Sequence, residues 1–385
     1  MLSPAKRRWH PEGEERAEQI RKDRFPDSAA IGKSGVQRFR DGNGDDASFN
    51  TGSTIVVRAS VNSGTTNAPT CDGEGFTRET NNMVLVGTTE VPSITMWPSL
   101  VFTESNAAGS TVVPCASAVS VGDTHMTTFD GLHYDFQAYG EFVLAQDGAN
   151  FTVQTRQAPG PPQYPNTAIN KAVAMQMGKT RVAIYIEPTR LTIDGAANNL
   201  ADGKTIVLPT GVQVSRLGNM YAVSSDNGDS VRATVQSQWL DVAVGLGHAP
   251  LTETRGLLGN PKGRAQVLAT SNGAILKTPI SFADLYHTYA DSWRVRPNES
   301  LFTEQMTIKA GIPLKPFFAS DLDPHASARA LARCKAAGVR GESLLEDCAL
   351  DTTVLNDEKA TRVFVHASPP RLVVKPILHV AAVIK

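Results

Sequence analysis

A series of short apolar runs, separated by glycine, asparagine and other turn residues, constrains the fold of this chain most strongly. Each run spans roughly three to seven residues, which is short for a helix and ordinary for a strand. Asp226-Asn227-Gly228-Asp229 lies between two runs and is typical of a tight hairpin. Strands at this spacing predict packed antiparallel sheets, as in a β-sandwich. The expected strands are Phe151–Gln157, Ala172–Met177, Arg181–Ile186, Leu191–Ile193, Val212–Arg216, Met220–Ser224, Ser230–Gln236 and Leu240–Val244.

Residues 122–136, just ahead of these runs, combine a polar turn with an alternating strand. The Phe-Asp-Gly sequence at 129–131 favours a turn because Asp and Gly tolerate the backbone angles that a turn needs. Apolar side chains then alternate and predict a half-buried strand: Leu132, Tyr134 and Phe136. A second turn at 138–140 leads into the apolar run 141–145, so we expect the two runs to pair as a hairpin.

These residues resemble the opening of the von Willebrand factor type D domain. Members of that family begin with G-D-x-H-x-x-T-F-D-G, followed by an aromatic strand and G-E-F/Y-V-L. The matching positions are Gly122, Asp123, His125, Thr128, Phe129, Asp130, Gly131 and residues 140–144; later landmarks are Gly256-Leu257-Leu258-Gly259-Asn260 and Ser292-Trp293. The resemblance covers roughly residues 115–300. It implies a mainly β protein with an antiparallel β-sandwich, and the low cysteine content looks like bacterial or otherwise cysteine-poor members.

Composition narrows the class of partner. The 37 basic and 38 acidic residues give a net charge of -1, so no overall field attracts nucleic acid or an anionic membrane. No apolar run reaches the length of about 20 residues that a transmembrane helix needs. The basic cluster at residues 6–8 is not followed by an apolar segment, so the start does not read as a secretory signal.

The chain divides into five expected segments. Residues 1–50 are charged and rich in Gly and Asp, which predicts disorder. Residues 51–118 form a small β subdomain, with expected strands at Thr54–Val61, Met83–Val86, Ser93–Met96 and Leu100–Phe102. The type D-like domain follows at 119–300, then a helical hairpin tail at 301–366 and an extension at 367–385.

The tail contains two expected helices and two of the four cysteines. Asp323-Pro324 followed by Ala326–Ala337 and Gly338 has an N-cap, a proline at the first helical position and a glycine stop. Ser343–Leu350 is the second expected helix, and a Cys334–Cys348 disulfide would join the two. Cys71 and Cys115 bracket the β subdomain and form the other expected pair; the alternative is four buried thiols. The tail also resembles the small helical segment that follows type D domains in some proteins.

The resemblance implies one Ca²⁺ near the opening turn, with Asp130 and Asn260 as ligands. Calcium prefers six to eight oxygen ligands. The loop after Asn260 instead carries Lys262 and Arg264, so the site looks degenerate. The alternative is a structural turn in which Asp130 caps backbone N–H groups.

Two activities of the family do not fit these residues. Some members cleave themselves at Asp-Pro, whereas Asp123 precedes Thr124; others use C-G-L-C for disulfide assembly, whereas residues 255–258 read Arg-Gly-Leu-Leu. A metal or acid–base cluster can also be drawn from His125, His133 and the aspartates around them. Strand alternation places only His133 and Asp135 on one face, too few for a closed zinc site, and favours buried, hydrogen-bonded histidines.

We therefore expect a non-enzymatic, extracellular or cell-surface module that binds protein or matrix partners in adhesion or surface assembly. One alternative is a metal-dependent hydrolase that uses His133, Asp135 or Asp130. Another is a carrier of lipid or apolar ligands, because domains similar to type D also occur in lipid-transfer proteins.

Overall fold

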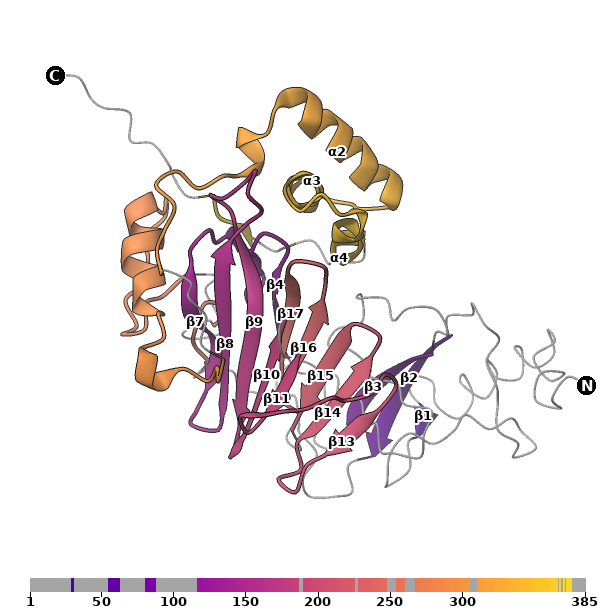
Figure 1. Ribbon diagram of the computed structural model, residues 1–385. Coiled ribbons are helices and arrows are strands. Elements are labelled where there is room, and N and C mark those ends of the chain that lie inside the picture. Colours follow the sequence, from indigo (N-terminus) through magenta and orange to yellow (C-terminus); the bar gives the residue numbers. More distant parts are fainter. Residues whose placement is uncertain are drawn as a thin grey trace, which may run out of the picture.

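The computed structural model describes residues 116–186, 190–225, 228–247, 254–259, 267–304, 310–365, 367, 370 and 372–375, with the backbone of three N-terminal strands. The strands from Ala116 onward form two antiparallel-rich sheets, with short helices towards the C-terminus (Figure 1). The expected mainly β fold with a helical tail is therefore confirmed.

The larger sheet has the strand order β13-β14-β15-β16-β17-β4-β5-β6-β18. Neighbours pair antiparallel except β18, which lies parallel to β6. Its strands are β13 (Thr205–Val207), β14 (Gln213–Leu217), β15 (Met220–Ser224), β16 (Ser230–Val235), β17 (Leu240–Leu246), β4 (Ala116–Val121), β5 (His125–Thr127), β6 (Leu132–Asp135) and β18 (Leu372–Val373).

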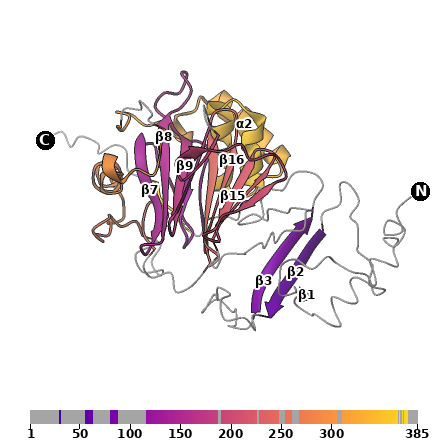
Figure 2. The same cartoon turned by 60° about the horizontal axis from the view of Figure 1, so that its bottom comes forward.

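The smaller sheet has the order β12-β11-β10-β9-β8-β7 and is antiparallel throughout. Figure 2 shows β7, β8 and β9 in one layer and β15 and β16 in the other. One apolar core contains buried side chains from both sheets, among them Val173, Met175, Val242 and Val244. The strands are β7 (Gly140–Asp147), β8 (Phe151–Pro159), β9 (Ala168–Met177), β10 (Thr180–Tyr185), β11 (Leu191–Ile193) and β12 (Ala196–Ala197).

The hairpin expected from residues 132–145 is wrong. β6 pairs with β5 in the larger sheet, whereas β7 pairs with β8 in the smaller one. The connection at 136–139 therefore crosses between the layers, and its Phe136 is completely buried in the shared core. Strand β6 was expected to be half-buried, but both of its faces are buried. Tyr134 faces the core, and His133, on the opposite face, is only 4% exposed.

Helices α2 (Pro324–Ala337), α3 (Glu342–Val354) and α4 (Arg362–Val365) gather at one end of the sandwich, near β4 and β17 (Figure 1). α2 begins as expected, because the Asp323 carboxylate accepts hydrogen bonds from two backbone N–H groups of the first turn. It ends at Gly338, whose φ of 99° favours glycine. α3 continues one turn beyond the expected Leu350. The other helical segments of the described residues are the π-helix η2 (Asp284–Ala290) and the short 3-10 helices η3 (Pro297–Glu299), η4 (Ala319–Asp321) and η5 (Glu358–Thr361).

The N-terminal part contributes a three-stranded sheet of β1 (Ala29–Ala30), β2 (Ile55–Asn62) and β3 (Thr80–Gly87). β2 and β3 overlap two of the four strands expected there; the other two, at 93–96 and 100–102, lie outside the described residues. Cys71 and Cys115 lie outside them as well, as does most of segment 1–50. None of the helices in the described residues is long and apolar enough to span a bilayer.

Candidate functional site: a buried histidine–aspartate cluster

Six titratable side chains meet between the larger sheet and the helical tail, and we refer to them as the His–Asp cluster. Four come from the turn after β4 and from strands β5 and β6, and two come from helix α3. The members are Asp123, His125, His133, Asp135, Asp347 and Asp351.

Strand pairing places the first histidine against its carboxylate. His125 on β5 lies directly opposite Asp135 on β6, and Thr127 lies opposite His133. Because side chains alternate along a strand, these four share one face while Met126 and Tyr134 point into the core on the other. His125 Nδ1 is 2.7 Å from Asp135 Oδ1, and His133 Nδ1 is 2.9 Å from the Thr127 hydroxyl.

The turn at residues 122–124 carries Asp123 beneath the helix. Thr124 has a φ of 64°, unusual for a β-branched residue, and its hydroxyl donates a hydrogen bond to the carbonyl of Phe136. Proline cannot take this conformation because its ring fixes φ near −65°. The Asp-Pro cleavage bond of some type D domains could therefore not be accommodated in this turn.

Helix α3 supplies the remaining two carboxylates. Asp347 and Asp351 are four residues apart and therefore lie on one face of the helix. The Asp123 backbone N–H donates to Asp351 Oδ1 at 2.9 Å, which ties the turn to the helix. A side chain at Gly122 would overlap Asp351 Oδ2, so the close approach of helix and turn depends on that glycine.

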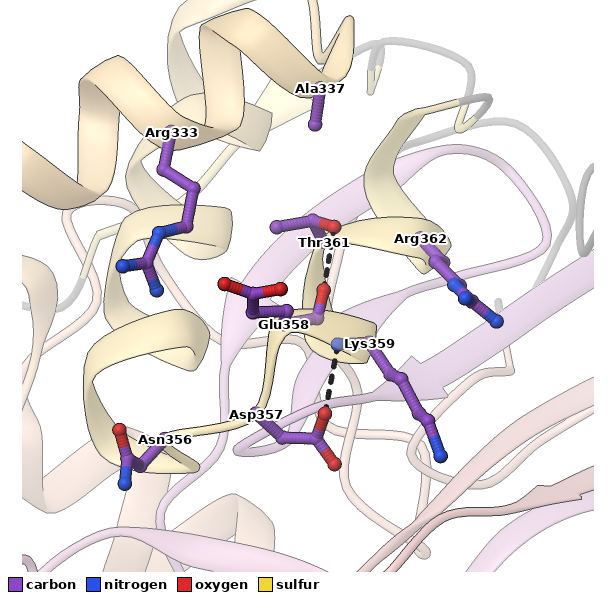
Figure 3. Close-up of a pocket in the computed structure, with 8 residues that line it drawn as sticks. All are labelled: Arg333, Ala337, Asn356, Asp357, Glu358, Lys359, Thr361 and Arg362. Carbon is purple, nitrogen blue, oxygen red and sulfur yellow. Dashed lines mark hydrogen bonds between the residues drawn. The ribbon is translucent and has the colours of Figure 1, made fainter.

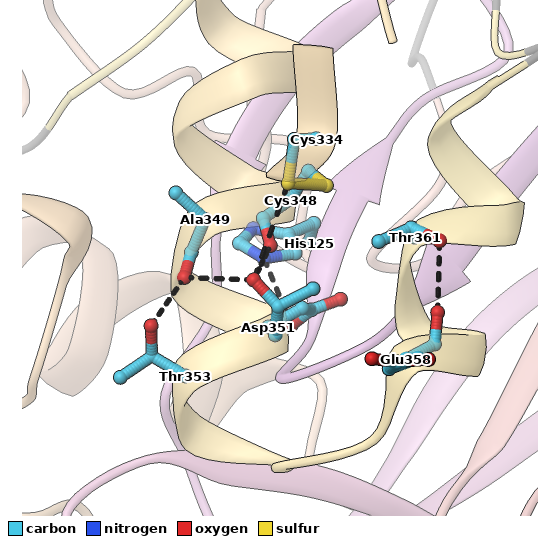
Figure 4. Close-up of a disulfide and its surroundings, with 9 residues drawn as sticks. His125, Cys334, Cys348, Ala349, Asp351, Thr353, Glu358 and Thr361 are labelled. Atoms are coloured by element: carbon cyan, nitrogen blue, oxygen red, sulfur yellow. Dashed lines mark hydrogen bonds and ion pairs between the residues drawn. A yellow bond between two sulfur atoms is a disulfide. The ribbon is translucent and has the colours of Figure 1, made fainter. Parts of the chain in front are cut away.

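A disulfide and two apolar clusters hold α3 in this position. Cys334 on α2 and Cys348 on α3 form the disulfide, and Figure 4 draws His125 and Asp351 in its surroundings. The buried residues around it are Val121, Val339, Leu344 and Phe364. On the other side, Leu350, Val354 and Leu355 pack with Trp239 and Ile169 of the sandwich.

Burial and mutual charge shift the pKa values of the cluster. Burial opposes protonation of His125, but the four surrounding carboxylates outweigh it and raise the pKa of this imidazole well above its usual range. Burial raises the pKa of Asp123 to about 8, although the nearby His125 acts in the opposite direction. Burial also acts to raise the pKa of Asp135, but the adjacent His125 charge prevails and lowers it.

Several polar atoms of the cluster approach closely without a hydrogen bond. His125 Nε2 is 2.8 Å from Asp123 Oδ1, and His133 Nε2 is 3.0 Å from Asp347 Oδ2. All four atoms are buried without a hydrogen-bond partner among the described residues, as are Asp123 Oδ2 and Asp351 Oδ2. Buried polar groups are normally satisfied, so this concentration of exceptions calls for an explanation.

Asp241, a buried carboxylate next to the cluster, has hydrogen-bond partners, as buried polar groups usually do. Asp241 Oδ1 accepts hydrogen bonds from the Gly122 N–H at 3.1 Å and from Trp239 Nε1 at 3.0 Å. Its Oδ2 accepts one from Gln236 Nε2 at 3.0 Å. Burial still raises the pKa of Asp241 to about 6, although these hydrogen bonds act to lower it. Asp241 is thus satisfied by hydrogen bonds, whereas Asp123 is not.

Of the two expected calcium ligands, only Asp130 is among the described residues, and it is not a member of this cluster. Asp130 lies in the opening turn, where its Oδ1 accepts a hydrogen bond from the Thr128 hydroxyl, and Asn260 lies outside the described residues. Phe129 N–H donates to Leu258 O at 3.2 Å, so the turn lies against the segment that ends at Gly259.

The remaining family landmarks pack as structural residues. Leu257 and Leu258 donate backbone hydrogen bonds to Val143 and Leu144 of β7. Trp293, 5% exposed, donates from its indole N–H to the carbonyl of Ala269 at 3.0 Å.

The sequence identified part of the His–Asp cluster and missed the rest. His133 and Asp135 do share a face, but His125 joins them through strand pairing, and Asp347 and Asp351 join through docking of α3. The two aspartates on one face of an expected helix were the available signal, yet their partners lie more than 200 residues away in the sequence.

Parts of several longer known proteins are similar to this chain. Human mucin-4 is 26% identical over 272 residues, covering 66% of this chain and 5% of its own length. Human sushi domain-containing protein 2 is 27% identical over 207 residues, covering 49% of this chain and 24% of its own length. Mouse mucin-4 is 24% identical over 229 residues. The chain thus spans a quarter or less of the length of these relatives. Residues 118–273 match the von Willebrand factor type D domain, and they contain most of both sheets and four of the six members of the His–Asp cluster.

Proposed function

We propose that the chain is a non-enzymatic extracellular or cell-surface module that binds protein or matrix partners in adhesion or surface assembly. The observation that carries this proposal is the burial of the groups best suited to acid–base chemistry: Asp123 and Asp351 are 0% exposed and His125 is 1% exposed. A catalytic acid or base must come within about 3 Å of its substrate, and α3 covers these groups. The type D match and the similarity to mucin-4 also support a structural or adhesive role. Four cysteines in 385 residues support placing the chain among cysteine-poor members of that family.

We place the partner-binding surface at a groove of about 600 Å³ between α2 and the segment of η5 and α4 (Figure 3). Side chains of both charges line it, as in the polar rims of many protein interfaces. The lining residues are Arg333, Ala337, Asn356, Asp357, Glu358, Lys359, Thr361 and Arg362.

A binding screen tests this function. The full chain is immobilised and exposed to purified matrix proteins, cell-surface proteins and a second copy of itself at physiological salt. We expect saturable binding to at least one of these proteins. The double variant Arg333→Glu with Arg362→Glu should weaken the affinity for that protein about tenfold or more. Arg329→Glu, on an exposed arginine of the same helix outside the groove, is the matched control and should bind normally.

The same preparation tests the alternatives. Ester, peptide and glycoside substrates are assayed across pH, and a fluorescent fatty acid tests apolar-ligand carriage. Turnover that disappears in His133→Gln, with no binding to any protein, would contradict the proposal in favour of a hydrolase. Saturable fatty-acid binding with no protein partner would favour a carrier.

We also propose that Ca²⁺ binds at the opening turn, through Asp130 and Asn260. The hydrogen bond from Phe129 to Leu258 supports it, because it holds the turn against the segment that leads to Asn260. Thermal unfolding in millimolar Ca²⁺ and in excess EDTA tests it. We expect a shift of several degrees that is absent in Asp130→Ala, whereas identical curves for the wild type would contradict the site.

A further inference from the structure

We propose that the His–Asp cluster binds one divalent transition-metal cation, with Zn²⁺ as the probe, through Asp123, His125 Nε2 and Asp351. The ion would join the turn after β4 to helix α3, and so fix the helical tail to the sandwich. This site is separate from the calcium site proposed at Asp130, and it goes beyond the binding function proposed above.

The spacing of the donor atoms is that of a coordination shell. His125 Nε2 is 2.8 Å from Asp123 Oδ1 and 3.3 Å from Asp351 Oδ1. Bonds of about 2.0–2.2 Å to a tetrahedral or octahedral ion place adjacent donors about 2.8–3.6 Å apart. These distances alone also fit hydrogen bonds, but no hydrogen bond is aligned at Nε2. Asp123, His125 and Asp351 each offer one ligand atom, and these atoms all lie within 4.8 Å of one another, which fits donors around a single ion.

The second nitrogen of the imidazole is already engaged. His125 Nδ1 lies 2.7 Å from Asp135 Oδ1, in a hydrogen bond across the paired strands β5 and β6. A histidine that binds a metal commonly donates its other N–H to a carboxylate, which fixes the tautomer and orients the ring. Metal binding replaces the Nε2 proton and leaves Nδ1 protonated, so the lone pair of Nε2 faces an ion held between Asp123 and Asp351. Asp135 is therefore a positioning residue and not a ligand.

Charge balance also favours a cation. The cluster contains four carboxylates and two imidazoles. When all four carboxylates are ionised, two negative charges remain even with both histidines protonated. Among the described residues, Lys375 lies at the rim of the cluster, but its side chain is exposed and pairs with Glu346. Buried charges are normally paired or bound to a metal. A divalent ion balances the two carboxylates of Asp123 and Asp351 that are fully buried.

The donor set selects the class of metal. Imidazole with carboxylate suits Zn²⁺ and neighbouring transition metals, whereas Ca²⁺ prefers six to eight oxygens. Asp123 Oδ2 and Asp351 Oδ2 have no hydrogen bond among the described residues and can complete the shell. The neighbouring pair His133 Nε2 and Asp347 Oδ2 lies on the Nδ1 side of His125, beyond the engaged nitrogen, so it is not part of the assigned site.

The test is zinc binding to the full chain without an affinity tag, since polyhistidine binds zinc itself. The protein is stripped with chelator, dialysed and titrated with Zn²⁺ by calorimetry in excess Ca²⁺, and bound metal is counted by mass spectrometry. We expect one Zn²⁺ per chain. Asp123→Asn, His125→Gln and Asp351→Asn should each weaken zinc binding by more than about 100-fold, and Asp135→Asn by about 10- to 100-fold. Glu342→Gln, an exposed acid on the same helix, is the matched control and should bind as the wild type does.

Two results would overturn the proposal: no zinc bound by the folded wild type, or ligand variants that bind zinc as tightly as Glu342→Gln does. X-ray absorption of the zinc-loaded wild type keeps the proposal falsifiable if the variants do not fold. We expect a shell of nitrogen and oxygen at about 2.0–2.2 Å with the scattering pattern of one imidazole. A shell without imidazole, or with sulfur, would contradict the assignment. If loss of His133 abolished binding while loss of Asp351 did not, the ion would lie on the other side of His125 and the assigned site would be wrong.

Discussion

Removing the disulfide of the helical tail, by Cys334→Ala together with Cys348→Ala, measures how firmly the tail is fixed to the sandwich. The two cysteines are 14 residues apart in the sequence. Closing a loop of this length lowers the entropy of the unfolded chain by an amount equivalent to about 3 kcal/mol at 25 °C. We therefore expect the free energy of unfolding of the tail to fall by about 3 kcal/mol, which changes the folded-to-unfolded ratio by more than about 100-fold.

Trp239 provides the assay, because its fully buried indole packs against Leu350 and Val354 of α3. Guanidinium titrations followed by tryptophan fluorescence would report release of the tail, with Trp239→Phe identifying the contribution of that indole. Adding reductant to the double variant isolates any effect of Cys71 and Cys115. A double variant whose free energy of unfolding lies within about 0.5 kcal/mol of the wild type would refute the reasoning.

Three further predictions concern single residues. Gly122→Ala should destabilise the protein more than Gly178→Ala, because both glycines have φ near 60° but only the new side chain at 122 meets another group; chemical denaturation of the two variants compares them. Leu350→Ala should lower the free energy of unfolding by about 2–5 kcal/mol and shift tryptophan emission to the red, and an unchanged spectrum would contradict the packing of α3. Asp241, whose pKa is raised by burial to about 6, holds its proton more tightly in the folded state than in the unfolded one. Its contribution to stability is therefore full below about pH 4 and is lost as the pH rises through about 6. Unfolding measured from pH 4 to 7 should show this decline in the wild type and a flatter profile in Asp241→Asn.

Local sequence signals predicted the elements of the fold well. All eight strands expected between residues 151 and 244 are present, because alternation and turn residues act within a few positions. Helix α2 was predicted for the same reason, since Asp323, Pro324 and Gly338 define its two ends. Two further strands of that region, β12 and β13, are only two and three residues long and were not predicted.

The way those elements meet could not be predicted from the same signals. Residues 132–145 looked like a hairpin, because two apolar runs flank a short turn. In the structure the strands lie in different layers, and the completely buried Phe136 stays in the core between them. The complete His–Asp cluster could not be predicted for a related reason. His133 and Asp135 share a strand face that sequence alone leaves open to solvent, and only docking of α3 brings Asp347 and Asp351 over it.

Amide hydrogen exchange of the full chain, metal-stripped and with one equivalent of Zn²⁺, tests most directly whether this cluster joins the tail to the sandwich. We predict that peptides from α3 and from residues 121–125 gain protection together, although they are more than 200 residues apart in the sequence. Neither should respond in Asp351→Asn, and both should respond in Glu342→Gln. Exchange that zinc leaves unchanged in the wild type, or that slows in only one of the two segments, would contradict the account.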